Sequence, residues 1–151
     1  MSAKEKTAKI DKKENIEEKM RGLAMELRTL ESYASDIQSR LGLVDSVLNE
    51  LSLSGATIQG LEKVDENDEV LMSLGGSAHL KVKIIDKEKV LVRLGAGVSI
   101  EKPVKEASTH IENEINNLFK TRQTFQKQFN QILERMTAVR KELEQMSRAQ
   151  A

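Results

Sequence analysis

The chain has 151 residues, of which 32% are charged and only 3% are aromatic, with no Trp. This composition disfavours a bulky globular core and fits long, solvated helices. Lysine plus arginine equals aspartate plus glutamate, at 24 each, so no excess positive charge points to nucleic acid as a partner.

Cysteine is absent from the chain, which excludes disulfides, thiolate metal sites and cysteine nucleophiles. The lysines near the N-terminus are not followed by an apolar run, so we expect no secretory signal. No segment approaches the roughly 18 consecutive apolar residues of a membrane span. We therefore expect a cytoplasmic protein with no membrane partner.

The first predicted element is a helix over about residues 11–53. Asp11 and Glu14 have the spacing of a capping box, and Ser54-Gly55 is a plausible helix end. Apolar residues recur at alternating intervals of four and three, the heptad pattern of a narrow coiled-coil seam. The seam residues of this helix are Ile16, Met20, Leu23, Leu27, Leu30, Ala34, Ile37, Leu41, Val44, Leu48 and Leu51.

A polar loop, Asp65-Glu66-Asn67-Asp68, precedes a change of the apolar period to two, which predicts strands with one buried face. Two consecutive β-hairpins are expected over about residues 69–101, with tight turns at Gly75-Gly76 and Gly95-Ala96-Gly97. The second glycine segment lacks the remaining residues of a phosphate-binding loop, so it is interpreted as a turn.

A second helix is predicted over about residues 103–148, with Pro103 as its first residue and no glycine afterwards. Two coiled-coil seams joined by a short β-rich segment predict an antiparallel helical hairpin that β structure holds at one end. The fold class is therefore expected to be α+β, with a single domain over residues 1–151. The second seam continues the same alternation through Phe125, Phe129, Ile132, Met136, Val139, Leu143 and Met146.

An antiparallel hairpin would gather four methionines at the end away from the strands. They either fill gaps in the seam or form a soft apolar surface that adapts to varied partners. These methionines are Met20, Met25, Met136 and Met146.

The sequence offers no catalytic constellation. His79 and His110 are the only histidines, and neither lies in a zinc-binding pattern; both are interpreted as surface residues. No nucleophile–base pair is visible. We therefore expect no catalytic residue, no metal and no cofactor.

The central segment and its flanks resemble the alpha class of prefoldin. The resemblance is carried by VLMSLGG at 70–76, by IDKEKVLVRLGAGVSIEK at 85–102, and by PVKEASTHIENEINNL at 103–118, with its Glu106-Ala107 pair. The resemblance is specific over about residues 69–118 and extends in architecture over nearly the whole chain. Two hairpins, rather than one, place the chain in the alpha class.

The resemblance implies a hexamer of two alpha and four prefoldin beta subunits, whose hairpins assemble an oligomeric β-barrel with the coiled coils as tentacles. The tentacle tips would hold unfolded client proteins and deliver them to a group II chaperonin without nucleotide hydrolysis. Client contact is then expected at seam positions near the tip, namely Met20, Leu23, Leu27, Met136, Val139, Leu143 and Met146. Subunit assembly is expected to use Val70, Met72, Leu80, Val82, Val90, Val92, Val98 and Ile100.

Two alternatives remain open. The chain could be a purely structural coiled-coil protein whose strands serve only to oligomerise it. It could also be a prefoldin paralogue that forms homo-oligomers or filaments. The mass and stoichiometry of the native complex would separate these alternatives.

Overall fold

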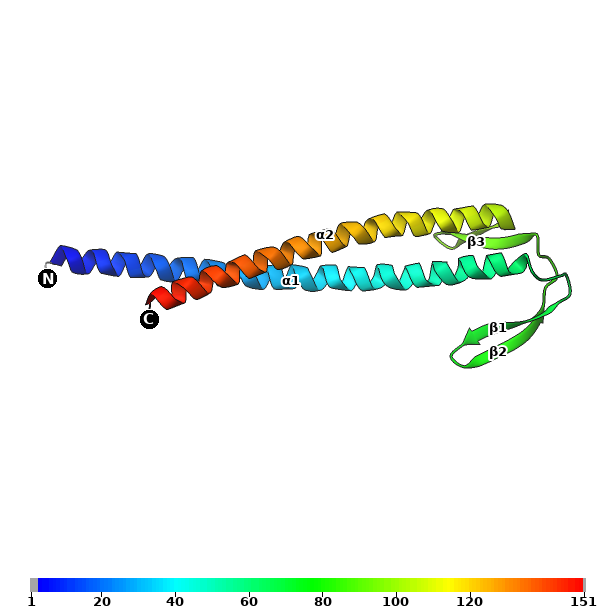
Figure 1. The fold of residues 1–151 in the computed structure, drawn as a ribbon, viewed down its shortest axis with the longest axis horizontal. Coiled ribbons are helices and arrows are strands. Elements are labelled where there is room, and N and C mark those ends of the chain that lie inside the picture. The colour runs from blue at the N-terminus through cyan, green and yellow to red at the C-terminus, as the bar shows by residue number, and fades with distance from the viewer. Residues whose placement is uncertain (1–2, 151) are drawn as a thin grey trace. The chain divides into compact units, whose positions relative to one another are not determined.

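The computed structural model describes the backbone of residues 3–150 and the side chains of residues 14–149. Two long helices flank two β-hairpins, so the predicted α+β architecture is confirmed (Figure 1). Assembly of the hairpins into a barrel concerns several chains and stays a prediction. The elements are α1 (Ala3–Leu61), β1 (Glu69–Gly75), β2 (Ala78–Lys83), β3 (Lys89–Gly95), β4 (Val98–Pro103) and α2 (Val104–Gln150).

Helix α1 is longer at both ends than the sequence pattern predicted. Asp11 lies inside the helix and does not cap its start, because the preceding residues are good helix formers without glycine or proline. The predicted end at Ser54-Gly55 is also wrong, since α1 continues to Leu61. The helix ends with 3₁₀-type hydrogen bonds, in which the backbone amides of Glu62 and Lys63 donate to carbonyls three residues earlier.

Gly55 remains helical because it occupies the next seam position after Leu51, where a small residue is useful. A Cβ atom at Gly55 would lie 3.8 Å from Cγ2 of Ile111 on α2, so the two helices approach closely there. The following seam position, Ile58, is only 8% exposed. Burial of Ile58 therefore favours continuing the helix beyond the glycine, and tertiary packing overrides the local stop signal.

Substituting Gly55→Ala should raise the free energy of unfolding by about 0.5–1 kcal/mol, because alanine has the higher helix propensity. The new methyl group would make an ordinary van der Waals contact with Ile111. Chemical denaturation followed by circular dichroism measures the change. Gly22→Ala is the matched control, since no heavy atom lies within 4 Å of its Cβ position. A loss of stability at Gly55 alone would show that the seam cannot accept the methyl group.

The two hairpins are separate two-stranded antiparallel sheets, β1 with β2 and β3 with β4. Both predicted glycine turns are confirmed. Each pairing shifts register just before its turn, where Gly75 and Gly95 have φ angles of +98° and +110°. Such positive angles suit glycine, and the resulting irregularity is typical of a bulge beside a tight turn.

The two hairpins are an internal repeat of one sequence pattern. The segment VLMSLG at 70–75 recurs as VLVRLG at 90–95, and the register is equivalent in both sheets. Val70 pairs with Val82, as Val90 pairs with Lys102. The chain therefore presents two copies of one hairpin design.

Pro103 is the last residue of β4, where it pairs with Lys89, and not the first residue of the second helix as predicted. Helix α2 begins at the next residue, Val104, whose amide donates to the Glu88 carbonyl at 2.9 Å. Proline lacks an amide hydrogen, so it is well placed where a strand ends and a helix starts.

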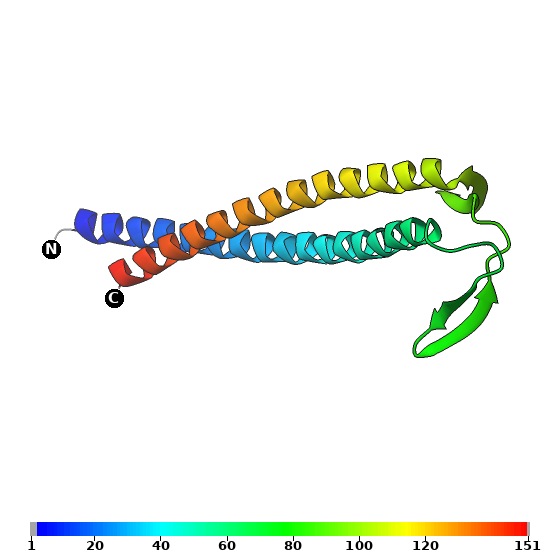
Figure 2. The ribbon, with the colours of Figure 1, turned by 45° about the vertical axis from the view of Figure 1, so that its right-hand side comes forward.

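The described residues form two compact units, and both long helices contribute to each. The first unit combines α1 up to Leu43 with α2 from Arg122, and the second spans Val44–Thr121. In the first unit, the two helices run side by side in opposite directions (Figure 1, Figure 2). The expectation of a single domain over the whole chain stays a prediction.

In the second unit, the hairpin of β3 and β4 packs against the last turns of α1 and the first turns of α2 (Figure 1). Ala107 is fully buried, and Leu51, Val90, Val104 and Ile115 pack around the central cluster. The hairpin of β1 and β2 has no buried residue. The buried cluster consists of Ile58, Val92, Ala107 and Ile111.

Candidate functional site

In the first unit, two ion pairs join α1 to α2 on the two flanks of the seam. The Arg135 guanidinium donates two hydrogen bonds to Glu26, from Nε to Oε1 at 2.6 Å and from Nη2 to Oε2 at 3.0 Å. Arg140 Nη2 donates to Glu31 Oε1 at 3.1 Å. The Glu26 carboxylate accepts these bonds and adds a negative charge, which together raise the pKa of Arg135 above its usual value.

The ion pairs show the relative direction and register of the helices. Glu26 and Arg135 each precede a seam residue, whereas Glu31 and Arg140 each follow one. In an antiparallel coiled coil, a residue that precedes a seam position faces another that precedes one, and a residue that follows a seam position faces another that follows one. This register brings the layer of Leu27 and Val139, and that of Leu30 and Met136, between the two ion pairs.

All seven residues predicted for client contact lie on the seam of the first unit. Val139 is fully buried and Met136 is 7% exposed, so these two have little surface available while the helices are together. Their part in client contact stays a prediction. The other five, which are Met20, Leu23, Leu27, Leu143 and Met146, are partly buried.

Several exposed apolar side chains of the first unit were outside the predicted client-contact set. Met25 is 74% exposed and Tyr33 is 59% exposed, and Leu133 is 42% exposed. Met25 was noted only as one of the gathered methionines. These residues lie off the heptad seam, so the seam pattern could not select them. Single exposed apolar residues are common and assign no role by themselves.

The predicted assembly residues divide between an exposed and a buried group. On the first hairpin, Met72 pairs with Leu80, and these side chains are 47% and 48% exposed. On the second hairpin, Val92 is already buried in the core of its own chain, and Val90 packs against that core. Their role in subunit assembly stays a prediction. Val98 and Ile100 are exposed, whereas Val70 and Val82 are partly buried.

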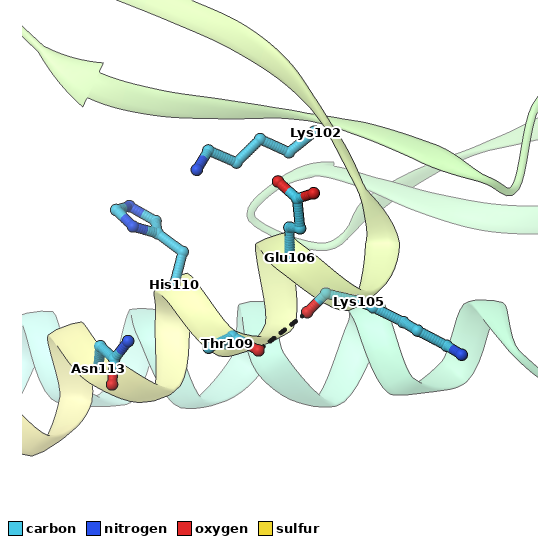
Figure 3. A pocket seen from close by; sticks show the side chains of 6 residues that line it. All are labelled: Lys102, Lys105, Glu106, Thr109, His110 and Asn113. Carbon is cyan, nitrogen blue, oxygen red and sulfur yellow. Dashed lines mark hydrogen bonds between the residues drawn. The ribbon is translucent and has the colours of Figure 1, made fainter.

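A shallow pocket opens at the start of α2, where six side chains from β4 and α2 gather (Figure 3). The His110 side chain is partly buried, at 26% exposed, whereas His79 is exposed. Its Nε2 atom lies 3.5 Å from Glu114 Oε1 and makes no hydrogen bond. The lining residues are Lys102, Lys105, Glu106, Thr109, His110 and Asn113.

This pocket contains no pair of groups suited to catalysis. The Thr109 hydroxyl donates to the Lys105 carbonyl at 3.1 Å, a bond within the helix, and no base contacts it. Among the side chains that the structure describes, no cluster of three or more His, Asp or Glu residues could hold a metal ion. The pocket therefore offers a mixed-charge surface and no reactive group.

None of the described helices contains a stretch that is both long and apolar enough to span a membrane.

The family model described as "Prefoldin subunit" matches residues 16–149. The chain is 24% identical over 131 residues to prefoldin subunit alpha of Methanocorpusculum labreanum, covering 82% of this chain and 89% of that protein. It is 29% identical over 117 residues to prefoldin subunit alpha of Archaeoglobus fulgidus, and the match covers 78% of this chain and 85% of that protein.

A solved structure shares the fold. The cryo-EM structure of filamentous PFD from Methanocaldococcus jannaschii has a TM-score of 0.65 and 25% sequence identity to this chain. The match covers 77% of this chain and 96% of that one. The match to the family model, from residue 16 to residue 149, includes both hairpins and most of both helices.

Proposed function

Because this chain belongs to the prefoldin family, we propose that it holds unfolded proteins without hydrolysing ATP, as an alpha subunit of a chaperone complex. Members of the family are non-enzymatic chaperone subunits, so the chain is not an enzyme. The observation that carries the proposal is the pair of β-hairpins between two coiled-coil helices, within a family match that spans residues 16–149.

The proposed partners are prefoldin beta subunits, in a complex of two alpha and four beta chains. An isolated two-stranded hairpin is marginally stable in water, and its free strand edges invite pairing. The hairpin of β1 and β2 exposes the cross-strand pair of Met72 and Leu80. Closure with strands of other subunits, in a β-barrel, would satisfy these edges and cover this apolar pair.

The proposed client site is the tip of the coiled coil, around Met20, Leu23 and Met146. Unfolded chains expose apolar segments, and weak contacts at several tips of one complex combine into useful, reversible binding. We propose that the complex works in the cytoplasm and delivers its client to a group II chaperonin.

Mixing the chain with a beta-class prefoldin tests the assembly. Native mass spectrometry should find a heterohexamer of two alpha and four beta subunits. This complex should suppress the aggregation of guanidine-denatured citrate synthase, with no ATP turnover. Removal of residues 1–22 and 137–151 should preserve assembly but abolish most of the suppression. Full suppression by the truncated complex would contradict client binding at the tips.

A second candidate function is that of a homo-oligomeric or filamentous paralogue. The similar solved structure is that of filamentous PFD, which favours this alternative. Size-exclusion chromatography with light scattering separates the two cases. A mass that grows with concentration even when beta subunits are present, with no mixed complex, would support the filament and contradict the heterohexamer.

A further inference from the structure

The buried tip residues pose a physical problem for client capture. Met136 is 7% exposed and Val139 is fully buried between the helices, so neither can contact a client while the seam is closed. Met20, Leu23 and Met146 lie nearer the free ends and are partly exposed. The amount of apolar surface offered to a client therefore depends on how far the two helices separate from their ends.

The ion pairs that resist this separation lie beside the buried layers. Glu26–Arg135 and Glu31–Arg140 flank the seam at the level of Val139 and Met136, one pair on each side. The Glu26–Arg135 pair is two-pronged, which gives it a defined geometry. Separating the helices at this level breaks both pairs.

We propose that these two ion pairs form an ionic clamp that sets how far the seam opens, so that ionic strength regulates client capture. The inference rests on the proposed client site at the tip. The four clamp side chains are between 36% and 59% exposed, so dissolved salt reaches and screens them. Screening acts on the charges of the clamp and leaves the apolar contacts, both within the seam and with a client, largely unchanged. Higher salt then exposes the layers that carry Met136 and Val139.

The test compares variants that remove the same charge from different places. Arg135→Gln/Arg140→Gln removes the clamp. Arg40→Gln/Arg148→Gln removes the same number of charges, but among the side chains that the structure describes these arginines pair within their own helices, with Asp36 and Glu144. Glu26→Arg/Arg135→Glu exchanges the partners and should preserve the clamp. Each full chain is assembled with beta subunits and tested on guanidine-denatured citrate synthase.

Exposed ion pairs contribute little individually, and we expect the clamp-free variant to capture about threefold to fivefold more client at low salt. The control and exchanged variants should match the natural chain. Between about 0.01 M and about 1 M salt, the Debye length falls from about 30 Å to about 3 Å, and the natural chain should approach the clamp-free variant. Equal capture by all variants at every salt concentration would overturn the proposal.

A distance measurement separates the clamp from the client function. The chain has no cysteine, so Met25→Cys/Lys141→Cys introduces the only two thiols for spin labels. Both positions are exposed, one on each helix of the first unit. The distribution of distances between the two labels should broaden when the salt concentration is raised and when the clamp is removed. Unchanged distances would reject the clamp. If the distance distribution broadens but no variant captures denatured citrate synthase, the result would support the clamp and contradict client binding by the complex.

Discussion

Replacing Val139 with aspartate should lower the free energy of unfolding by about 3 kcal/mol or more, because the new carboxylate would be buried in an apolar seam. Val139 is fully buried, and its neighbours along the seam, Met136 and Leu143, supply no hydrogen-bond donor from their side chains. Thermal unfolding of the full chain, followed by far-ultraviolet circular dichroism, measures the loss. The preceding residue, Ala138, is exposed, so Ala138→Asp is the matched control and should have little effect.

The Val139→Asp variant should also gain a pH dependence that the natural chain lacks at this position. Burial raises the pKa of the introduced carboxyl in the folded state above its unfolded value of about 3.9. The folded state then binds the proton more tightly, so stability rises as pH falls toward this range and is lost as pH increases. A Val139→Asn variant should show no such dependence. Equal losses at positions 138 and 139 would contradict the seam packing.

Replacing Val92 with aspartate should detach the second hairpin from the helices, with a loss of about 2–3 kcal/mol. Val92 packs with Ile58, Ala107 and Ile111 in the core of the second unit. A two-stranded hairpin without this contact is only marginally stable. Hydrogen–deuterium exchange of the β3 and β4 amides should therefore increase strongly, while exchange of the β1 and β2 amides should not change.

Leu91→Asp provides the control for this variant. Leu91 is the preceding residue of the same strand, and it is 72% exposed on the opposite face of the hairpin. Because its side chain points away from the helices, the substitution should leave amide exchange in β3 and β4 nearly unchanged in the unassembled chain. A similar increase in amide exchange for both variants would show that strand propensity, rather than the contact of Val92 with the helices, keeps the hairpin folded.

Local sequence patterns were sufficient for the elements and their order. The alternation of four and three predicts both helices, since it reports which residues a single partner helix can bury. The glycines at 75, 76, 95 and 97 predict the two turns, because positive φ angles are required there. The repeat of VLMSLG as VLVRLG was also present in the sequence and could have been found by comparing the two strand pairs.

Local patterns were insufficient where a distant contact decides the outcome. Gly55 looks like a helix end, yet α1 passes through it because Ile58 is buried against α2 and the second hairpin. The two faces of the second hairpin could not be distinguished either, since both carry apolar side chains: Leu91 is exposed and Val92 is buried. Period-two alternation places these residues on opposite faces without saying which face meets the helices.

The sequence by itself determined that two heptad helices enclose two glycine-turned hairpins, because heptad spacing and turn chemistry depend on neighbouring residues alone. The tertiary structure decided that Val92, rather than Leu91, faces the helices, and that Glu26 and Glu31 pair with arginines of the other helix. These choices depend on which surfaces meet across long stretches of chain. The same seam that the heptads predict is thus partly exposed toward its free end, whereas Met136 and Val139 are buried between two flanking ion pairs.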